Sequence, residues 1–144
     1  MLPQPRAEVP QVIVPIRRLD RAALRALAYA RSISRDVTAV CLMSADEAEK
    51  IAKAIRRRAA DVAVAIPGGG LGRYLDDRER ADPERTIAVV ISDVIPQRRW
   101  SYVLDGEALL KLRLLVRPNT VVVDVPYVPR AHRLGSLPAL ASAD

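Results

Sequence analysis

The sequence predicts a three-layer α/β sandwich around a five-stranded parallel sheet. Short apolar segments rich in β-branched residues alternate with segments of helical periodicity, an order typical of α/β domains. Two of the apolar segments, 86–92 (TIAVVIS) and 120–127 (TVVVDVPY), contain few polar residues, as expected for strands buried on both faces of a parallel sheet. For such a domain we expect the strand order 3-2-1-4-5, with right-handed crossovers.

The composition fits this fold class and narrows the range of partners. Of the 144 residues, 50% are hydrophobic, but only 3% are aromatic and none is Phe, so the core must be aliphatic. So few aromatic side chains disfavour a stacking surface for nucleic acids, which leaves such binding to charge alone. The net charge of +6, mainly an excess of arginine, suits an anionic small ligand or an anionic membrane surface, and a merely solvated basic surface explains it equally well.

The first strand–helix unit begins at residue 12. Residues 12–16 (VIVPI) form the first strand, and we expect its proline to stop the pairing. Asp20 is placed to cap a helix that runs to about residue 33. The helical period gives this helix an inner face of Ala23, Leu24, Leu27, Ala30 and Ile33.

The second unit repeats this order. Residues 37–43 form a strand that contains Cys41, which reads as a small buried apolar residue. Ser44 and Glu47 have the spacing of a capping box for a second helix. That helix ends near the arginines 56–58, where cations stabilise the helix dipole.

The second half of the chain supplies three more strands. Residues 61–67 form the third strand, the glycine-rich residues 68–72 a loop, and residues 73–81 a short helix that Asp82-Pro83 ends. A long helix, entered through VIPQRRW, joins the fourth strand to the fifth. The glycine run matches neither a dinucleotide-binding nor a P-loop motif, so we expect it to act as a flexible connection.

We expect one folded domain over residues 12–129, between a flexible N-terminal segment, 1–11, and a flexible C-terminal tail, 130–144. The first 11 residues lack the apolar region of a signal peptide, and no apolar stretch reaches the roughly 20 residues that span a bilayer. The sequence therefore favours a soluble, cytoplasmic location.

The residues that usually carry catalysis or metal binding do not form recognisable patterns. Cys41 is the only cysteine, and the only histidine, His132, lies in the tail, so no thiolate–imidazole pair is indicated. No carboxylate pair or metal-ligand spacing is visible. We therefore expect no cofactor, no metal site and no enzymatic activity.

The candidate ligand site lies where the first and fourth strands end side by side. This edge of the sheet would bring together the polar residues that follow the two strands, since parallel strands end at one edge. Two arginines could clamp a phosphate, a tryptophan could stack on a base, and a carboxylate could accept from a ribose or an adenine. The candidate residues are Arg17, Arg18, Ser92, Asp93, Gln97, Arg98, Arg99 and Trp100.

Each of these residues also has a structural interpretation. The two arginines after the first strand could be solvated loop charges. Trp100 could pack the long helix onto the sheet, and Asp93 could cap a turn. Asp124, among valines, could face a basic residue or lie at an exposed edge of the sheet.

Four segments together resemble one known family. They are VIVPI with a following leucine, RALAYARSISRDVTAV with DEAEK, VIPQRRW, and ALLKLRLLVRPNTVVVDVPY. Across residues 12–127 the chain resembles the universal-stress-protein-like cytoplasmic C-terminal domain of bacterial amino-acid-permease-like (APC superfamily) transporters. The resemblance implies a regulatory domain beneath a membrane transporter core and, in one branch of potassium importers, binding of cyclic di-AMP.

The resemblance also implies a homodimer formed through the fifth strand. The residues expected at that interface are Val121, Val123, Val125, Pro126 and Tyr127. The glycine motif by which stress proteins bind ATP is absent after the fourth strand: the corresponding stretch, residues 92–110, has a single glycine, Gly106. The leading hypothesis is a non-enzymatic regulatory domain that senses an adenine nucleotide or a cyclic dinucleotide. The alternatives are a standalone nucleotide-binding protein and an enzyme acting on a phosphorylated metabolite.

Overall fold

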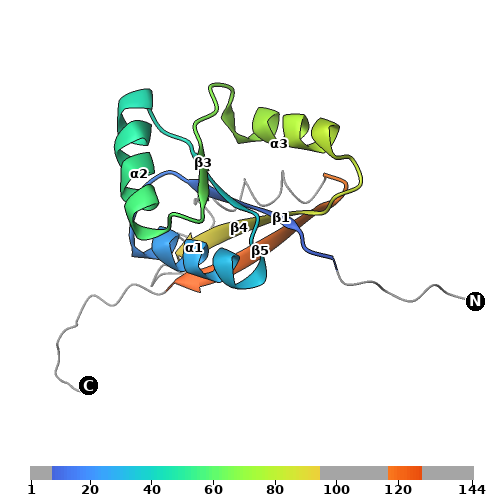
Figure 1. The fold of residues 1–144 in the computed structure, drawn as a ribbon, viewed down its shortest axis with the longest axis horizontal. Coiled ribbons are helices and arrows are strands. Elements are labelled where there is room, and N and C mark those ends of the chain that lie inside the picture. Colours follow the sequence, from blue (N-terminus) through green and yellow to red (C-terminus); the bar gives the residue numbers. More distant parts are fainter. Residues whose placement is uncertain (1–7, 95–116, 128–144) are drawn as a thin grey trace, which may run out of the picture.

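The structure, a computed structural model, describes residues 8–94 and 117–127, without the side chains of residues 93, 94 and 127. Five parallel strands form one sheet in the order β3-β2-β1-β4-β5, which confirms the predicted α/β fold and strand order (Figure 1). The elements are β1 (Gln11–Ile16), α1 (Arg21–Ile33), β2 (Val37–Cys41), α2 (Ala45–Arg58), β3 (Ala63–Ala65), α3 (Gly70–Ala81), β4 (Ile87–Val94) and β5 (Thr120–Tyr127).

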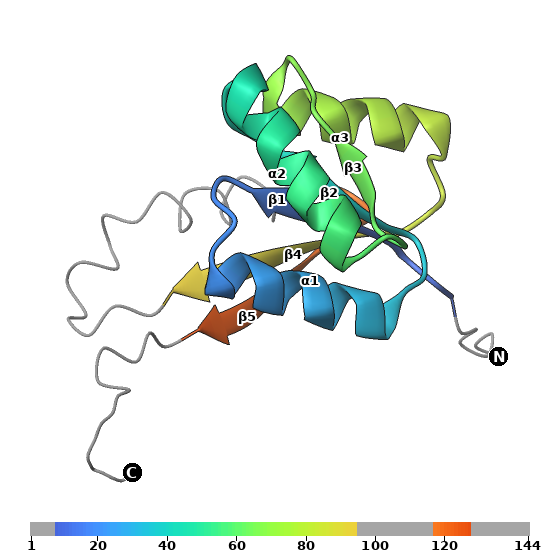
Figure 2. The same ribbon diagram turned by 60° about the vertical axis from the view of Figure 1, so that its left-hand side comes forward.

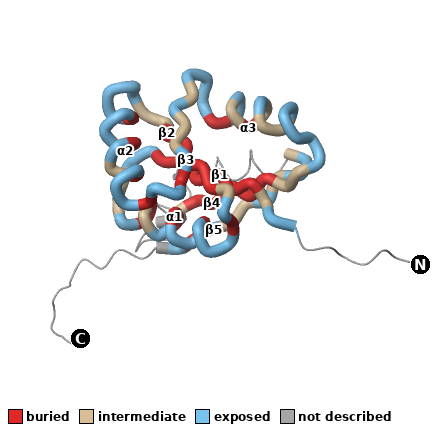
Figure 3. The backbone as a smooth tube through the Cα atoms, in the orientation of Figure 1, coloured by how far each residue is buried: buried red, intermediate tan, exposed pale blue. Residues whose placement is uncertain are grey.

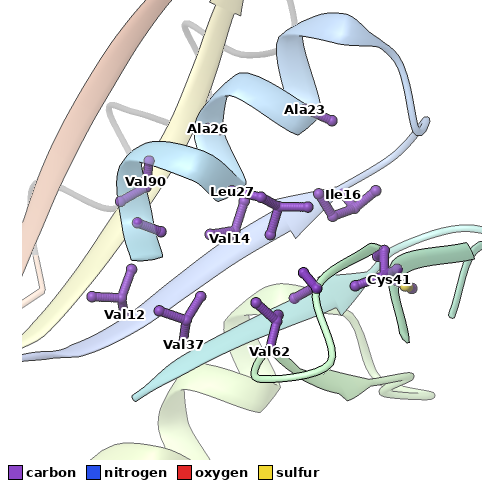
Figure 4. Packing of buried hydrophobic residues seen from close by; sticks show 14 of the residues in the cluster. Val12, Val14, Ile16, Ala23, Ala26, Leu27, Val37, Cys41, Val62 and Val90 are labelled. Carbon is purple, nitrogen blue, oxygen red and sulfur yellow. The ribbon is translucent and has the colours of Figure 1, made fainter. Parts of the chain in front are cut away.

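The helices lie on both faces of the sheet, as Figure 2 shows. On one face, alternate residues of the central strands pack against α1 and α2; Figure 4 shows Val12, Val14 and Ile16 of β1 beside Leu27 of α1. The intervening residues, such as Ile13, point to the other face and pack against α3. This alternation produces two cores and confirms the three-layer arrangement.

The central strands are the most deeply buried part of the sheet (Figure 3). Val12 and Ile13, which point to opposite faces, are both 0% exposed, as are Val89 and Val90 of β4. Full burial of an aliphatic side chain contributes about 1.5–3 kcal/mol. The aliphatic core expected from the composition is therefore centred on β1 and β4.

Helix α1 begins and packs largely as predicted. The Asp20 carboxylate Oδ1 accepts a hydrogen bond of 2.8 Å from the amide of Ala23, which satisfies one of the free donors at the helix start. The buried positions are Ala22, Ala23, Ala26, Leu27 and Ala30. Ile33 was expected on this face but is 37% exposed. With Tyr29, one turn earlier, it lies on the flank of the helix away from α2.

Helix α2 begins at the predicted place but without the predicted cap. Ser44 occupies the N-cap position, yet its side chain makes no capping hydrogen bond. Both Ser44 and Glu47 are exposed, so water can satisfy the amides of the first turn and the capping box is not needed there. The helix ends at Arg58, as the arginine triplet indicated.

The third strand and the third helix differ from the prediction at their boundaries. β3 has three residues instead of seven because it is an edge strand, which pairs only with Thr38–Val40 of β2. α3 begins at Gly70, inside the predicted glycine loop. Leu71, in its first turn, is buried together with Leu75, and this burial outweighs the low helix propensity of glycine.

Arg117, three residues before β5, forms hydrogen bonds with α3. Its Nη1 donates to Asp76 Oδ1 and to Glu79 Oε1, both at 2.8 Å, and its Nη2 donates to the carbonyl of Gly72 at 3.0 Å. Only 20% of the Arg117 side chain is exposed. The contact therefore links two segments that are more than 35 residues apart in the sequence.

The two helix starts provide a matched test of capping. Asp20→Ala removes an observed capping hydrogen bond and is expected to lower the free energy of unfolding by about 1 kcal/mol. Ser44→Ala removes no such bond and should change it by less than about 0.5 kcal/mol. Urea unfolding of both variants measures the difference, and equal losses would contradict the assigned caps.

Candidate functional site

The carboxyl ends of β1 and β4 form the topological switch point of the sheet. The chain adds β2 and then β3 on one side of β1 through α1 and α2. It then returns by way of α3 on the opposite face and places β4 on the other side of β1. Open α/β sheets bind ligands beside such a point, so this edge remains the first place to look for a site.

Pro15 ends the pairing between β1 and β4 at this edge. Successive residues of β1 direct their backbone groups to opposite neighbouring strands. The amide of Gln11 donates at 3.0 Å to the carbonyl of Thr86, the residue just before β4. The amide of Val12 donates at 2.9 Å to the carbonyl of Asp36, the residue just before β2. By the same alternation, the backbone of Pro15 faces β4, as that of Gln11 does, but a proline has no N–H to donate. The β1–β4 pairs accordingly stop at Ile13 and Val89.

The expectation that this proline would stop the pairing is therefore correct on one side only. β1 remains paired with β2 up to Ile16, whose carbonyl accepts from the amide of Leu42 at 2.8 Å. On the other side, the carbonyl of Val90 faces a position of β1 without a donor. The hydrogen-bonded pairing of the two central strands thus ends just before the loop that carries the two arginines.

Arg17 and Arg18 lie in the bend that follows β1, and both are exposed. Arg18 Nη2 is 3.8 Å from Asp20 Oδ2, and 84% of the Arg18 side chain is exposed. A pair so exposed contributes little stability, so the Arg18 guanidinium can exchange Asp20 for another anion at little cost. The structure thus places both arginines at the predicted edge, on the loop that begins α1.

The β4 side of the candidate site is described only in part. Ser92 lies in β4 and is half-buried. The backbone of Asp93 also lies in β4, paired with Pro126 of β5. The predicted residues Gln97, Arg98, Arg99 and Trp100 lie outside the described part of the chain. The described part of the site therefore consists of the Arg17–Arg18 bend and the last residues of β4.

The residues expected at a dimer interface divide into two groups. Val125 is only 6% exposed and, with the half-buried Val123, packs in the core beneath α1. Val121 is 49% exposed, and Pro126 is exposed as well. Tyr127 pairs with Val94 through its backbone.

Strand β5 is an edge strand among the described residues, since it pairs only with β4. The carbonyl of Asn119 accepts from Ile87 of β4 at 2.9 Å, so the even-numbered residues of β5 direct their backbone groups to the open edge. Pro126 is one of these residues, and a proline is tolerated there because no hydrogen bond of the sheet is lost. Asp124 is exposed.

Other candidate chemistry finds no support within residues 8–94 and 117–127. Cys41 is 1% exposed, and burial raises the pKa of its thiol, which keeps the thiol protonated. This part of the chain has no group of three or more His, Cys, Asp or Glu residues that could hold a metal ion. It also contains no helix with the length and hydropathy to cross a bilayer.

Restoring the missing donor tests the role of Pro15. In Pro15→Val, the new amide should donate to the carbonyl of Val90 and extend the β1–β4 pairing toward the edge. The stability should change by less than about 1 kcal/mol, because the added hydrogen bond offsets the loss of the proline's restriction on the unfolded chain.

Hydrogen exchange measures this outcome directly. The amide introduced at position 15 should be protected to about the same degree as the amide of Val14, which faces β2 and serves as the internal control. Rapid exchange at position 15 would mean that the strands part for a reason other than the missing donor.

Comparison with known proteins agrees with this architecture. The chain matches none of the curated proteins with which it was compared. Residues 6–127 match the family described as the KimA potassium transporter C-terminal domain. The matched segment includes all five strands and ends with the last residue of β5. The chain therefore belongs to the KimA potassium transporter C-terminal domain family.

Proposed function

We propose that this chain is a cytoplasmic, non-enzymatic regulatory domain, similar to universal stress proteins, that acts on the membrane core of a potassium transporter. The family match supports the association with a transporter, since the family is named for the C-terminal domain of one. The domain would bind an anionic nucleotide at the carboxyl edge of β1 and β4, with cyclic di-AMP as the first candidate ligand.

The observation that carries this proposal is the position of Arg17 and Arg18. Both exposed guanidinium groups follow directly on the point where Pro15 ends the β1–β4 pairing. Guanidinium groups bind phosphates through paired hydrogen bonds, and a ligand with two phosphates offers one for each arginine. The N-terminal end of α1, just beyond the bend, adds a favourable potential for an anion.

The end of the β1–β4 ladder offers no backbone acceptor to a ligand. Val90 is 0% exposed, so its carbonyl is closed to a ligand and to water. The recognition of a nucleotide at this edge would therefore rest on the two arginines and on the start of α1.

The proposal includes a second copy of the chain beside β5. The open edge of this strand and the 49% exposed Val121 support such a contact, because both are unfavourable to leave in water. Val125 would take no part in it, because its side chain is buried and its backbone groups face β4. Sedimentation equilibrium of the chain tests this part, and a monomer at all concentrations up to about 0.1 mM, roughly a hundred times a micromolar Kd, would refute it.

Thermal unfolding in the presence of nucleotides tests the ligand. A ligand that binds only the folded chain, at about 100 times its Kd, adds about 2.7 kcal/mol to the free energy of unfolding and raises the Tm by several degrees. We expect this shift with cyclic di-AMP, and a loss of most of it in the double variant Arg17→Ala, Arg18→Ala.

The matched control is Arg57→Ala, Arg58→Ala. It removes the same charge from the end of α2, at the opposite edge of the sheet, and should retain the full ligand-induced shift. Equal losses in the two double variants would indicate nonspecific charge attraction. No shift of the unaltered chain with cyclic di-AMP, ATP or AMP at millimolar concentration would contradict nucleotide binding.

A further inference from the structure

The charges of the described residues are divided unevenly between the two helical layers. Residues 21–61, which include α1 and α2, contain nine Lys or Arg and five Asp or Glu, a net charge of +4. Residues 70–86, which include α3, contain four Lys or Arg and five Asp or Glu, a net charge of −1. Within the described residues, the segment with α1 and α2 is therefore clearly basic, whereas the segment with α3 is close to neutral.

The basic layer carries a cluster of arginines at the amino edge of the sheet, where the strands begin. Both α1 and α2 end at this edge, because each is followed by a short turn and the next strand. Arg35 lies in the turn after α1, and Arg57 and Arg58 form the last two residues of α2. We call these three exposed residues the amino-edge patch.

The two helix ends that carry the patch lie close together. A small groove of about 80 Å³ between them is lined by residues of both helices, including Leu27 and Arg31 of α1 and Ile55 and Arg58 of α2. The patch is therefore a local concentration of charge at one corner of the molecule.

The nearby carboxylates are already engaged by other arginines. Asp61 pairs with Arg31, whose Nη2 lies 3.0 Å from Asp61 Oδ1, and the hydrogen bond from Arg31 lowers the pKa of the Asp61 carboxyl. Asp36 pairs with Arg85, whose Nη1 lies 2.7 Å from Asp36 Oδ2. Within the described part of the chain, the amino-edge patch thus keeps its positive charge without an ion-pair partner.

The same edge is where the chain enters the domain. Ser34 Oγ donates to the carbonyl of Pro10 at 2.8 Å, and Arg85 Nη2 donates to the carbonyl of Val9 at 3.4 Å. These bonds hold the entering segment beside Arg35, at the end of the sheet opposite the arrowheads of β4 and β5 (Figure 2). If the chain is the C-terminal domain of a transporter, as the proposed function has it, the membrane-embedded part precedes this segment.

We propose that the amino-edge patch, Arg35, Arg57 and Arg58, docks on the anionic phospholipid headgroups of the membrane surface. The inference deepens the proposed function and rests on it for the direction of the membrane. Each arginine near an anionic bilayer strengthens partitioning about fivefold. Helix α3, whose segment lacks this positive charge, tilts away from the surface, and the carboxyl edge with Arg17 and Arg18 faces the aqueous side, where a soluble nucleotide can reach it.

Cosedimentation with lipid vesicles tests this docking on the 144-residue chain alone. The chain should bind vesicles that contain phosphatidylglycerol, bind pure phosphatidylcholine vesicles far more weakly, and dissociate as salt is raised, because the attraction is electrostatic. The triple variant Arg35→Glu, Arg57→Glu, Arg58→Glu should bind the anionic vesicles at least about tenfold more weakly.

A charge-matched variant separates the patch from net charge. Arg21→Glu, Arg25→Glu, Arg73→Glu makes the same change in charge at exposed positions outside the patch and should weaken binding by less than about threefold. Circular dichroism and Tm measurements on both variants verify that they fold. Equal losses in the two variants would overturn the proposal.

The other outcomes are equally decisive. If the unaltered chain does not bind anionic vesicles, the proposal is wrong. A chain that binds cyclic di-AMP but not vesicles overturns the membrane docking alone. A chain that binds vesicles but no nucleotide overturns the proposed nucleotide sensing and leaves the docking intact.

Discussion

The two central strands must satisfy their backbone hydrogen bonds within the sheet, because side chains cover both of their faces. β1 and β4 contain residues at or near 0% exposure on each face, so water cannot replace a missing partner in the middle of either strand. This constraint fixes β2 and β4 as the neighbours of β1, and it requires one helical layer on each side. A proline in such a sheet is therefore expected where the pairing of a strand ends or on an edge strand.

Pro15 and Pro126 illustrate the two ways in which the sheet accommodates this residue. Pro126 directs its missing donor to the open edge of β5, where no bond of the sheet is lost. Pro15 directs its missing donor to β4 and ends the ladder near the carboxyl end of β1. Two exposed arginines follow the point where this ladder ends, and their position, without any loop motif, marks the candidate ligand site.

The sequence predicts the architecture of this domain well because hydrophobic periodicity and strand alternation are local properties. The Asp20 cap and the buried Cys41 follow from patterns within a few residues, and the strand order follows from the topology that alternating strands and helices favour. The errors arise where a tertiary contact decides. The length of β3 depends on the extent of its single neighbour, β2, and the start of α3 depends on the burial of Leu71 against the sheet.

The candidate site is less accessible from the sequence. Arg17 and Arg18 could be placed at the switch point from topology alone. The strand that the missing donor of Pro15 faces could not be predicted, because it depends on which neighbouring strand each β1 residue faces. The isolation of Arg35, Arg57 and Arg58 likewise depends on pairing: Arg31 engages Asp61 and Arg85 engages Asp36 across distances in the sequence that no local pattern reports.

The two ends of the sheet have different roles in this account: the amino edge meets the membrane and the carboxyl edge meets the ligand. The most direct test of the second assignment is a titration of the ¹⁵N-labelled chain with cyclic di-AMP, followed by amide chemical shifts. The account predicts the largest changes at residues 16–20 and 91–94, with the amides of Glu84 and Asn119 at the amino edge unaffected. Changes centred on the amino edge, or none at a saturating concentration, would contradict it.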